Sequence, residues 1–252
     1  MKYLINLTIG ILLLGILVWN PTPLQILELK TFDWLMASKE PVQDNMVLLV
    51  DLDEEIVEAY GGYPLQRSLY ATLIERTQGT AGVTVLMPDP DIRGAGEDVA
   101  LAKALRTNPA VLAYTASNQA TQVGPHVGTA QLGGDPKEWL YQYPGILRQE
   151  HDAVGVGLVR RLPLVVESGG KLFPSFALEM LRVGVGDPSY QISTKDTGIE
   201  WLRIPSFPVI KTDANSRIWI TSNINFHRQS AAEYIQQPME GAVFVIFGVT
   251  AE

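Results

Sequence analysis

The sequence predicts an α/β protein in which an N-terminal transmembrane helix precedes a mainly parallel-sheet domain of three layers. Two observations lead to this prediction. Residues 3–19 form a long apolar run, and residues 46–115 alternate between strand-like and helix-like segments. We therefore divide the chain into a transmembrane anchor at 1–20, a membrane-proximal helix and linker at 21–45, and a folded body at 46–252.

The anchor is predicted from the length and hydropathy of the first segment. The seventeen residues from Tyr3 to Trp19 include no charged residue, and a helix of that length rises roughly 25 Å, close to the ~30 Å of bilayer hydrocarbon. A cleaved signal peptide and a buried core helix are the alternatives, but the run is long for a signal peptide and apolar on every face. Lys2 favours a cytoplasmic N-terminus, which places the body outside the cytoplasm.

Composition narrows the function classes of the body. A hydrophobic fraction of 46% and a charged fraction of 18% are typical of a globular chain. The net charge of −8 argues against nucleic acid as a partner, because phosphate binding needs clustered Lys and Arg. The chain has no cysteine, which excludes disulfides, thiolate metal sites and cysteine nucleophiles. We predict no cofactor.

Hydrophobic periodicity predicts the elements in order. After a helix at 24–37, the first half of the body reads as strand 46–53, helix 66–78, strand 82–87, helix 97–107 and strand 110–115. This alternation indicates a parallel sheet with right-handed crossovers. Residues 117–150 read as surface loop with a short helix at 138–143. The second half reads as strands within 154–166, a turn at 169–170, a helix from Pro174 to about Val183, strands at 200–204, 218–221 and 243–247, and a helix at 231–236.

The helix at 24–37 carries apolar residues on two faces. One face holds Leu24, Leu27, Thr31, Trp34 and Leu35, and the other holds Ile26, Leu29, Phe32 and Met36. Either one face packs on the body while the other contacts something else, such as a second copy of the chain, or the helix is deeply buried. We expect a homodimer.

Two acidic pairs follow predicted strands. Asp51 and Asp53 follow the first strand, and Asp89 and Asp91 follow the second. Ligands of open α/β sheets bind at the carboxyl ends of strands, and such acids can hold Mg²⁺ or Ca²⁺. The alternative functional hypothesis is therefore a membrane-anchored, metal-dependent phosphohydrolase that uses these four acids. Capping of helices and turns is the structural interpretation of the same residues, and we favour it.

Other chemistry-bearing residues form no recognised catalytic set. The three histidines are far apart in sequence, no serine lies in a Gly-x-Ser-x-Gly setting, and we predict neither catalytic nor metal-binding residues. Arg67, Arg160 and Arg161 are suited to an anion or to a carboxylate of the fold. Since neighbouring strand residues alternate in direction, at most one of Arg160 and Arg161 is buried and paired. The candidate ligand-binding residues are Asp51, Asp53, Tyr63, Arg67, Asp89, Asp91 and Arg160.

Several short motifs taken together resemble a known family. They are Leu29-Lys30-Thr31-Phe32-Asp33, Val50-Asp51-Leu52-Asp53-Glu54, Gly62-Tyr63-Pro64-Leu65-Gln66-Arg67, Glu97-Asp98 with Leu101 to Leu105, Val159-Arg160-Arg161-Leu162-Pro163-Leu164, Pro174 to Glu179, and Gly248 to Ala251. In order and spacing, residues 28–251 resemble a CHASE domain of the second type, the cyclase/histidine-kinase-associated sensory extracellular family. The chain departs from the family at Tyr63-Pro64-Leu65, where Trp-Pro-Trp is usual.

This resemblance implies a periplasmic sensory domain behind one N-terminal helix, held at the inner membrane. In the family, further transmembrane helices and a cytoplasmic nucleotide cyclase, diguanylate cyclase or kinase follow. The resemblance implies no enzyme activity for these residues and names no stimulus, which we expect to be a small molecule or a protein.

Overall fold

The computed structural model describes residues 21–85, 87, 91–113, 160–168, 171–195, 198–220 and 223–249, together with Tyr3, Asn6, Gly10, Gly15 and Trp19. The loop predicted at 117–150, its short helix, the turn at 169–170 and the strand portion at 154–159 lie outside these residues. So does most of the anchor predicted at 1–20, which stays a prediction. In the described part of the chain, no helix combines the length and apolarity needed to cross a bilayer.

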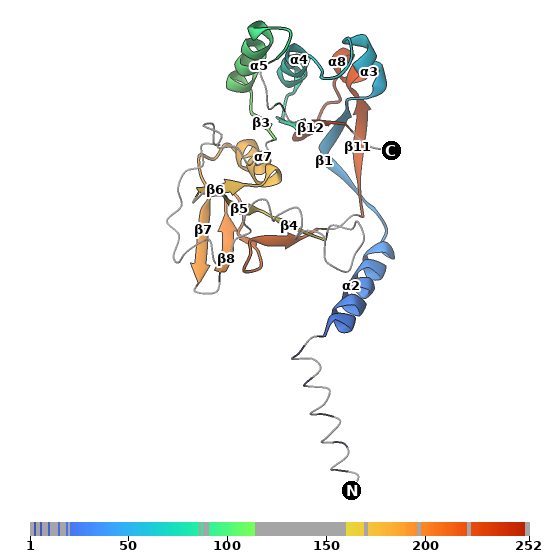
Figure 1. The fold of residues 1–252 in the computed structure, drawn as a ribbon, viewed down its shortest axis with the longest axis vertical. Helices are drawn as coiled ribbons and strands as arrows, with labels where there is room; N and C mark the ends of the chain where they lie inside the picture. Colours follow the sequence, from blue (N-terminus) through green and yellow to red (C-terminus); the bar gives the residue numbers. More distant parts are fainter. Residues whose placement is uncertain are drawn as a thin grey trace.

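A five-stranded parallel sheet forms the centre of the body (Figure 1). Its strands are, in spatial order, β11 (Ile224–Ser230), β1 (Val42–Asp51), β12 (Phe244–Gly248), β2 (Thr80–Val83) and β3 (Ala110–Leu112). Every neighbouring pair is parallel. The predicted parallel sheet is therefore confirmed, but the last strand, β12, lies between the first two strands of the predicted alternation.

Helices cover one face of this sheet with a single apolar core (Figure 1). They are α3 (Glu54–Ala59), α4 (Arg67–Arg76), α5 (Ala95–Thr107) and α8 (Ala231–Gln236). The strands contribute every second residue to the core, for example Leu48 and Val50 of β1 and Val245 and Phe247 of β12, as the two-residue period of a strand requires.

Helix α7 (Phe176–Gly184) packs on the opposite face, which gives the body its three layers (Figure 1). It lies so close to β2 that a Cβ added at Gly82 would stand 2.7 Å from Phe176 Cζ and 2.8 Å from Met180 Sδ. A Cβ added at Gly184 would stand 2.6 Å from Phe244 Cε1. Glycine at these two positions thus permits the close approach of helix and sheet.

Short antiparallel strands form a second unit on the far side of α7 (Figure 1). They are the hairpin β5 (Val165–Ser168) and β6 (Lys171–Pro174), the pair β4 (Arg161–Pro163) and β10 (Arg217–Trp219), and the sheet β7 (Gln191–Lys195), β8 (Gly198–Arg203) and β9 (Ile210–Lys211). Their core joins Leu178 of α7 to Tyr190, Ile199, Leu202 and Ile204. Helix α7 therefore belongs to this smaller core and lies against the central sheet on its other side.

Helix α2 (Thr22–Ala37) projects from the start of β1 beyond the sheet (Figure 1). None of its residues is buried, so the deeply buried helix considered above is wrong. Phe32 contacts the body, whereas Leu27, Trp34 and Leu35 are 61%, 68% and 49% exposed. The expectation that one face packs on the body is confirmed, and a contact of the exposed face with a second copy stays a prediction.

One further prediction is wrong, and two elements discussed below were missed. Pro174 does not begin a helix but ends β6, and Ser175 caps α7 by accepting a hydrogen bond from the Leu178 amide at 3.3 Å. Helix α3 was missed because it has only six residues. Strand β11 was missed because its exposed polar residues hide any strand period.

Candidate functional site

Helix α2 is fixed to the body by an ion pair between two of the motifs named above. Arg160 directly precedes β4 and is only 6% exposed. Its Nε and Nη2 donate to the two carboxylate oxygens of Asp33 at 2.8 and 2.6 Å. These hydrogen bonds hold the pKa of Asp33 below its ordinary value. A bidentate Arg–carboxylate pair fixes orientation as well as distance, so α2 is held at a defined angle to β4.

An aromatic stack lies beside this ion pair. Phe32 of α2 meets Trp219 of β10 with ring centroids 4.8 Å apart. The guanidinium of Arg161 lies over the same Trp219 ring, 4.1 Å from its centroid. Arg160 and Arg161 therefore point in different directions, one buried in an ion pair and the other stacked, as the strand alternation predicted. We call Phe32, Asp33, Arg160, Arg161 and Trp219 the α2 joint.

The end of α2 is also linked to the central sheet. The Asn223 side-chain amide donates to the carbonyl of Met36 at 3.5 Å, and the Asn223 carbonyl accepts from the Val42 amide at 3.1 Å. Asn223 directly precedes β11, and Val42 begins β1. A displacement of β1 or β11 would therefore also displace the end of α2.

A second constellation joins the start of α4 to α5. Arg67 forms an ion pair with Asp98, and the neighbouring Glu97 accepts a hydrogen bond from the Ser68 amide at 2.7 Å. Glu97 thus satisfies one of the amides that a helix N-terminus leaves without a partner. Like the α2 joint, this contact links two motifs that are distant in sequence.

The predicted site residues Tyr63 and Asp91 lie around that second constellation. Arg93 donates to the Pro64 carbonyl at 2.8 Å, and its backbone amide donates to Asp91 at 2.8 Å. The latter hydrogen bond holds the pKa of Asp91 below its ordinary value. Tyr63 precedes a cis peptide bond to Pro64 and is 64% exposed. Arg67 and Asp91 thus each contact other residues of the domain, Arg67 through its ion pair with Asp98 and Asp91 through the Arg93 amide.

The acids at the end of β1 differ in their roles. Asp53 caps α3 by accepting from the Ile56 amide at 3.1 Å. Asp51 faces Arg228 of β11 at 3.8 Å, and its second oxygen is buried without a partner among the described residues. Asp89, His126 and His151 lie outside those residues. Within the described ranges, no three His, Asp or Glu side chains gather in a way that could hold a metal ion. Capping, the structural interpretation, is confirmed for Asp53.

The predicted candidates therefore divide among three places: Arg160 in the α2 joint, Tyr63, Arg67 and Asp91 near the start of α4, and Asp51 and Asp53 between the end of β1 and the start of α3. Sequence reasoning missed Asp33, Trp219 and Asp98 as members of these sites. Asp33 and Asp98 lie in the motifs that carry the family resemblance, which was the available signal. Trp219 gave none.

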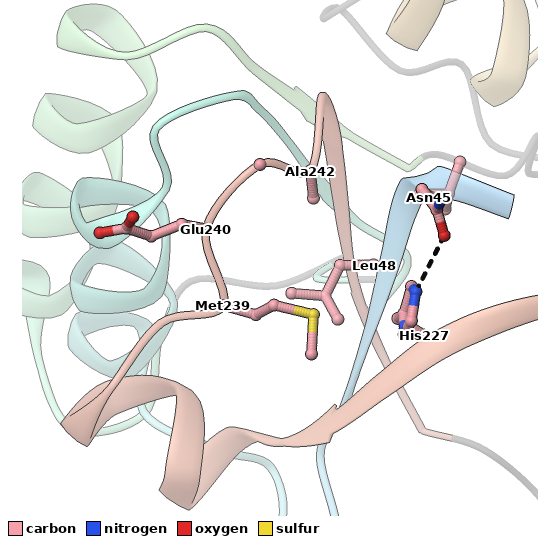
Figure 2. Close-up of a pocket in the computed structure, with 8 residues that line it drawn as sticks. Asn45, Leu48, His227, Met239, Glu240 and Ala242 are labelled. Carbon is pink, nitrogen blue, oxygen red and sulfur yellow. Dashed lines mark hydrogen bonds between the residues drawn. The ribbon is translucent and has the colours of Figure 1, made fainter.

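A pocket of about 200 Å³ opens at the amino ends of the central strands (Figure 2). Its walls come from β1, from β11 and from the loop between α8 and β12; the lining residues are Asn45, Val47, Leu48, His227, Met239, Glu240, Gly241 and Ala242. His227 and Asn45 are hydrogen-bonded, with 3.1 Å between Nε2 and Oδ1. The sequence analysis predicted none of these residues as a site residue, because no sequence motif connects them.

The fold and the contacts described above define a three-layer α/β domain that is held to the preceding helix α2 by an ion pair and ring contacts. The domain is of the extracellular sensory class, because the family model of the CHASE2 domain matches residues 8–252, and the chain belongs to this family of sensory domains associated with signalling proteins. The family is sensory and not catalytic. No curated protein and no solved structure matches the chain significantly.

Proposed function

We propose that the chain is the extracytoplasmic input domain of a membrane-bound receptor, which couples a stimulus to a cytoplasmic cyclase, diguanylate cyclase or kinase outside these residues. The CHASE2 match carries the proposal. It begins at residue 8, inside the apolar run at 3–19, so the run and the folded body are matched together. We propose that this run is the membrane anchor, with the N-terminus in the cytoplasm.

The α2 joint is the proposed point of signal transfer. Helix α2 directly follows the apolar run, and its described contacts with the body include the Asp33–Arg160 pair, the Phe32–Trp219 stack and Asn223. A stimulus shifts a receptor only if it binds two arrangements with different affinity. A joint made of one ion pair, one ring contact and one cation–ring contact can rearrange without unfolding a core.

The exposed face of α2 is the proposed dimer contact. Leu27, Trp34 and Leu35 are exposed on a helix that ends at the start of the body. Two copies anchored in one membrane would have their α2 helices parallel, and apolar side chains at this spacing pack between helices. Net charge argues against a nucleic-acid partner.

A reporter fusion tests the topology. Alkaline phosphatase, which is active only after export, is fused after Asn45 in one version of the protein, and a fluorescent protein that folds only in the cytosol is fused there in another. We expect phosphatase activity and no fluorescence. Cytosolic fluorescence alone, or a mature chain that begins after Asn20, would contradict the proposal.

Cysteine labelling tests the joint, because the chain has no native cysteine. A single cysteine replaces Met36, which is half-buried in α2, and its reaction with a maleimide is timed in membranes. Asp33→Asn should speed the reaction by several-fold, since it removes one charge of the pair. Glu28→Gln removes the same charge from the exposed side of α2 and should leave the rate unchanged. Equal rates in all three proteins would remove the joint from the proposal.

Phosphoester hydrolysis separates the receptor from the phosphohydrolase hypothesis. Purified chain should not hydrolyse a phosphate ester in the presence of Mg²⁺ or Mn²⁺. Hydrolysis that disappears in Asp51→Asn would replace the proposed function with the hydrolase.

A further inference from the structure

The pocket at Asn45 and His227 exists because strand β1 bulges away from β11. Asp44 pairs with Phe226 and Leu48 with His227, so three residues of β1 face no partner on β11. The Asp44 carboxylate holds this bulge by accepting from the Met46 and Val47 amides, both at 2.8 Å. Asn45 is one of the three unpaired residues.

The opposite wall is held just as firmly. The side chain of Gln229 donates to the Gln237 carbonyl at 2.9 Å and accepts from the Met239 amide at 3.2 Å. Gly241 turns the chain with a φ of +91°, a value that favours glycine. Hydrogen bonds from β11 therefore hold the loop at 237–241 in place.

The lining of the pocket combines an apolar floor with one polar pair. Figure 2 shows Met239 and Leu48 pointing toward each other between Glu240 on one side and the Asn45–His227 pair on the other. Since Asn45 Oδ1 accepts, His227 Nε2 must donate, and a neutral imidazole then presents Nδ1 as an acceptor. The Asn45 amide still has its N–H donors. The pair thus offers a donor and an acceptor side by side.

Size and charge limit the ligand further. A volume of about 200 Å³ corresponds to about seven water molecules at their liquid volume of roughly 30 Å³. The net charge of −8 disfavours an anion. A group that both accepts and donates a hydrogen bond, on a short apolar chain, complements what remains.

We propose that this pocket binds a small uncharged amphiphile, a short apolar chain that ends in a hydroxyl or a carboxamide group. The polar end exchanges hydrogen bonds with Asn45 and His227, and the chain lies against Leu48 and Met239. This inference rests on the proposed function, because it gives the sensory domain its stimulus. Asn45 is three residues from Val42, which is linked through Asn223 to Met36, so occupancy of the bulge acts on the end of α2.

Ligand-observed NMR on the full chain in detergent tests the proposal with four probes of equal chain length. Pentan-1-ol and pentanamide should bind, and they distinguish the hydroxyl from the carboxamide end. Pentanoate cannot donate a hydrogen bond to His227 Nδ1, and the pentylammonium ion cannot accept one from the Asn45 amide, so each should bind at least about tenfold more weakly. Equal binding of all four probes would overturn the assigned ligand class, and no binding of either uncharged probe would overturn the site.

Variants locate the binding. His227→Ala and Asn45→Ala should each weaken the better uncharged probe about tenfold or more. Phe226→Ala, on the same strand but outside the pocket lining, should leave binding unchanged. An unchanged thermal unfolding midpoint shows that a variant has folded, and unweakened binding in both folded pocket variants would overturn the assignment. Binding is measured without membranes or output, so its failure is distinguishable from failure of the topology experiment.

Discussion

The central sheet and the smaller unit behind α7 bury their side chains by different means. The sheet core is almost wholly apolar, with one buried hydroxyl pair, Thr77 and Tyr234, at 3.0 Å. Among the residues that the structure describes, the smaller core has seven buried apolar side chains. Beside them lies an ionic network on α7, in which Glu179 accepts from Arg182 at 2.6 Å and from the Tyr190 hydroxyl. A small core that lacks apolar area gains orientation from charged hydrogen bonds.

The ionic network shifts the pKa values of Glu179 and Tyr190. Burial raises the pKa of Glu179, but the hydrogen bonds from Arg182 and Tyr190 outweigh burial and leave that pKa below its ordinary value. Burial raises the pKa of the Tyr190 hydroxyl most, and the hydrogen bond that this hydroxyl donates to Glu179 raises it further. The smaller unit should therefore respond to acid, whereas the sheet core should not. The predictions below test this contrast.

The largest expected effect is in the sheet core. Leu73 of α4 is fully buried, so Leu73→Ala should lower the free energy of unfolding by about 2–5 kcal/mol through lost burial and the cavity left behind. Equilibrium urea unfolding, followed by circular dichroism, measures the change. Val99→Ala on the exposed face of α5 is the control and should stay within about 0.5 kcal/mol. Equal losses in the two variants would contradict the assigned core.

The ionic network should come next. Glu179→Gln leaves Arg182 and Tyr190 without their charged acceptor and should cost about 1.5–3 kcal/mol at neutral pH. Because the folded pKa of Glu179 is depressed, its stabilisation is complete above the unfolded value of about 4.3 and is lost as pH falls through the folded value. Urea unfolding against pH should show the two proteins converging below about pH 4, and a constant difference would refute the network.

Helix caps provide an intermediate test in both units. Ser175 caps α7, and Ser230 caps α8 by accepting from the Glu233 amide at 3.1 Å. Replacement of either serine by alanine should cost about 1 kcal/mol, because one amide loses its acceptor. Glycine at the same position restores most of the backbone freedom of a cap and should cost less, which separates capping from side-chain packing. The urea midpoint measures both series.

The smallest expected effect belongs to an exposed pair in the smaller unit. The Lys195 Nζ and Glu200 Oε1 atoms are 2.5 Å apart, and the two side chains are 64% and 40% exposed. Glu200→Gln should change the free energy of unfolding by less than about 1 kcal/mol, and the difference should shrink in high salt. This variant is matched to Glu179→Gln in chemistry. A loss as large as that of Glu179→Gln would show that partial burial does not set the difference between the two pairs.

Local patterns in the sequence determined much of the fold. The apolar run of β1, the amphipathic periods of α4 and α5 and the two-sided α2 were all predicted, because periodicity depends on neighbours in the chain. The alternation of Arg160 and Arg161 was predicted for the same reason. Local patterns also placed Asp53 after a strand, and its favoured role as a cap is the one it has in the structure.

Contacts between distant residues were decided only by the tertiary structure. The insertion of β12 between β1 and β2 joins strands almost 200 residues apart, and the Asp33–Arg160 pair joins residues 127 apart. The Asn45–His227 pocket likewise needs a bulge in one strand and a loop from elsewhere. Contacts of this kind form only when two surfaces pack against each other in the folded chain. The pattern of residues along one segment does not identify the distant segment that it will contact.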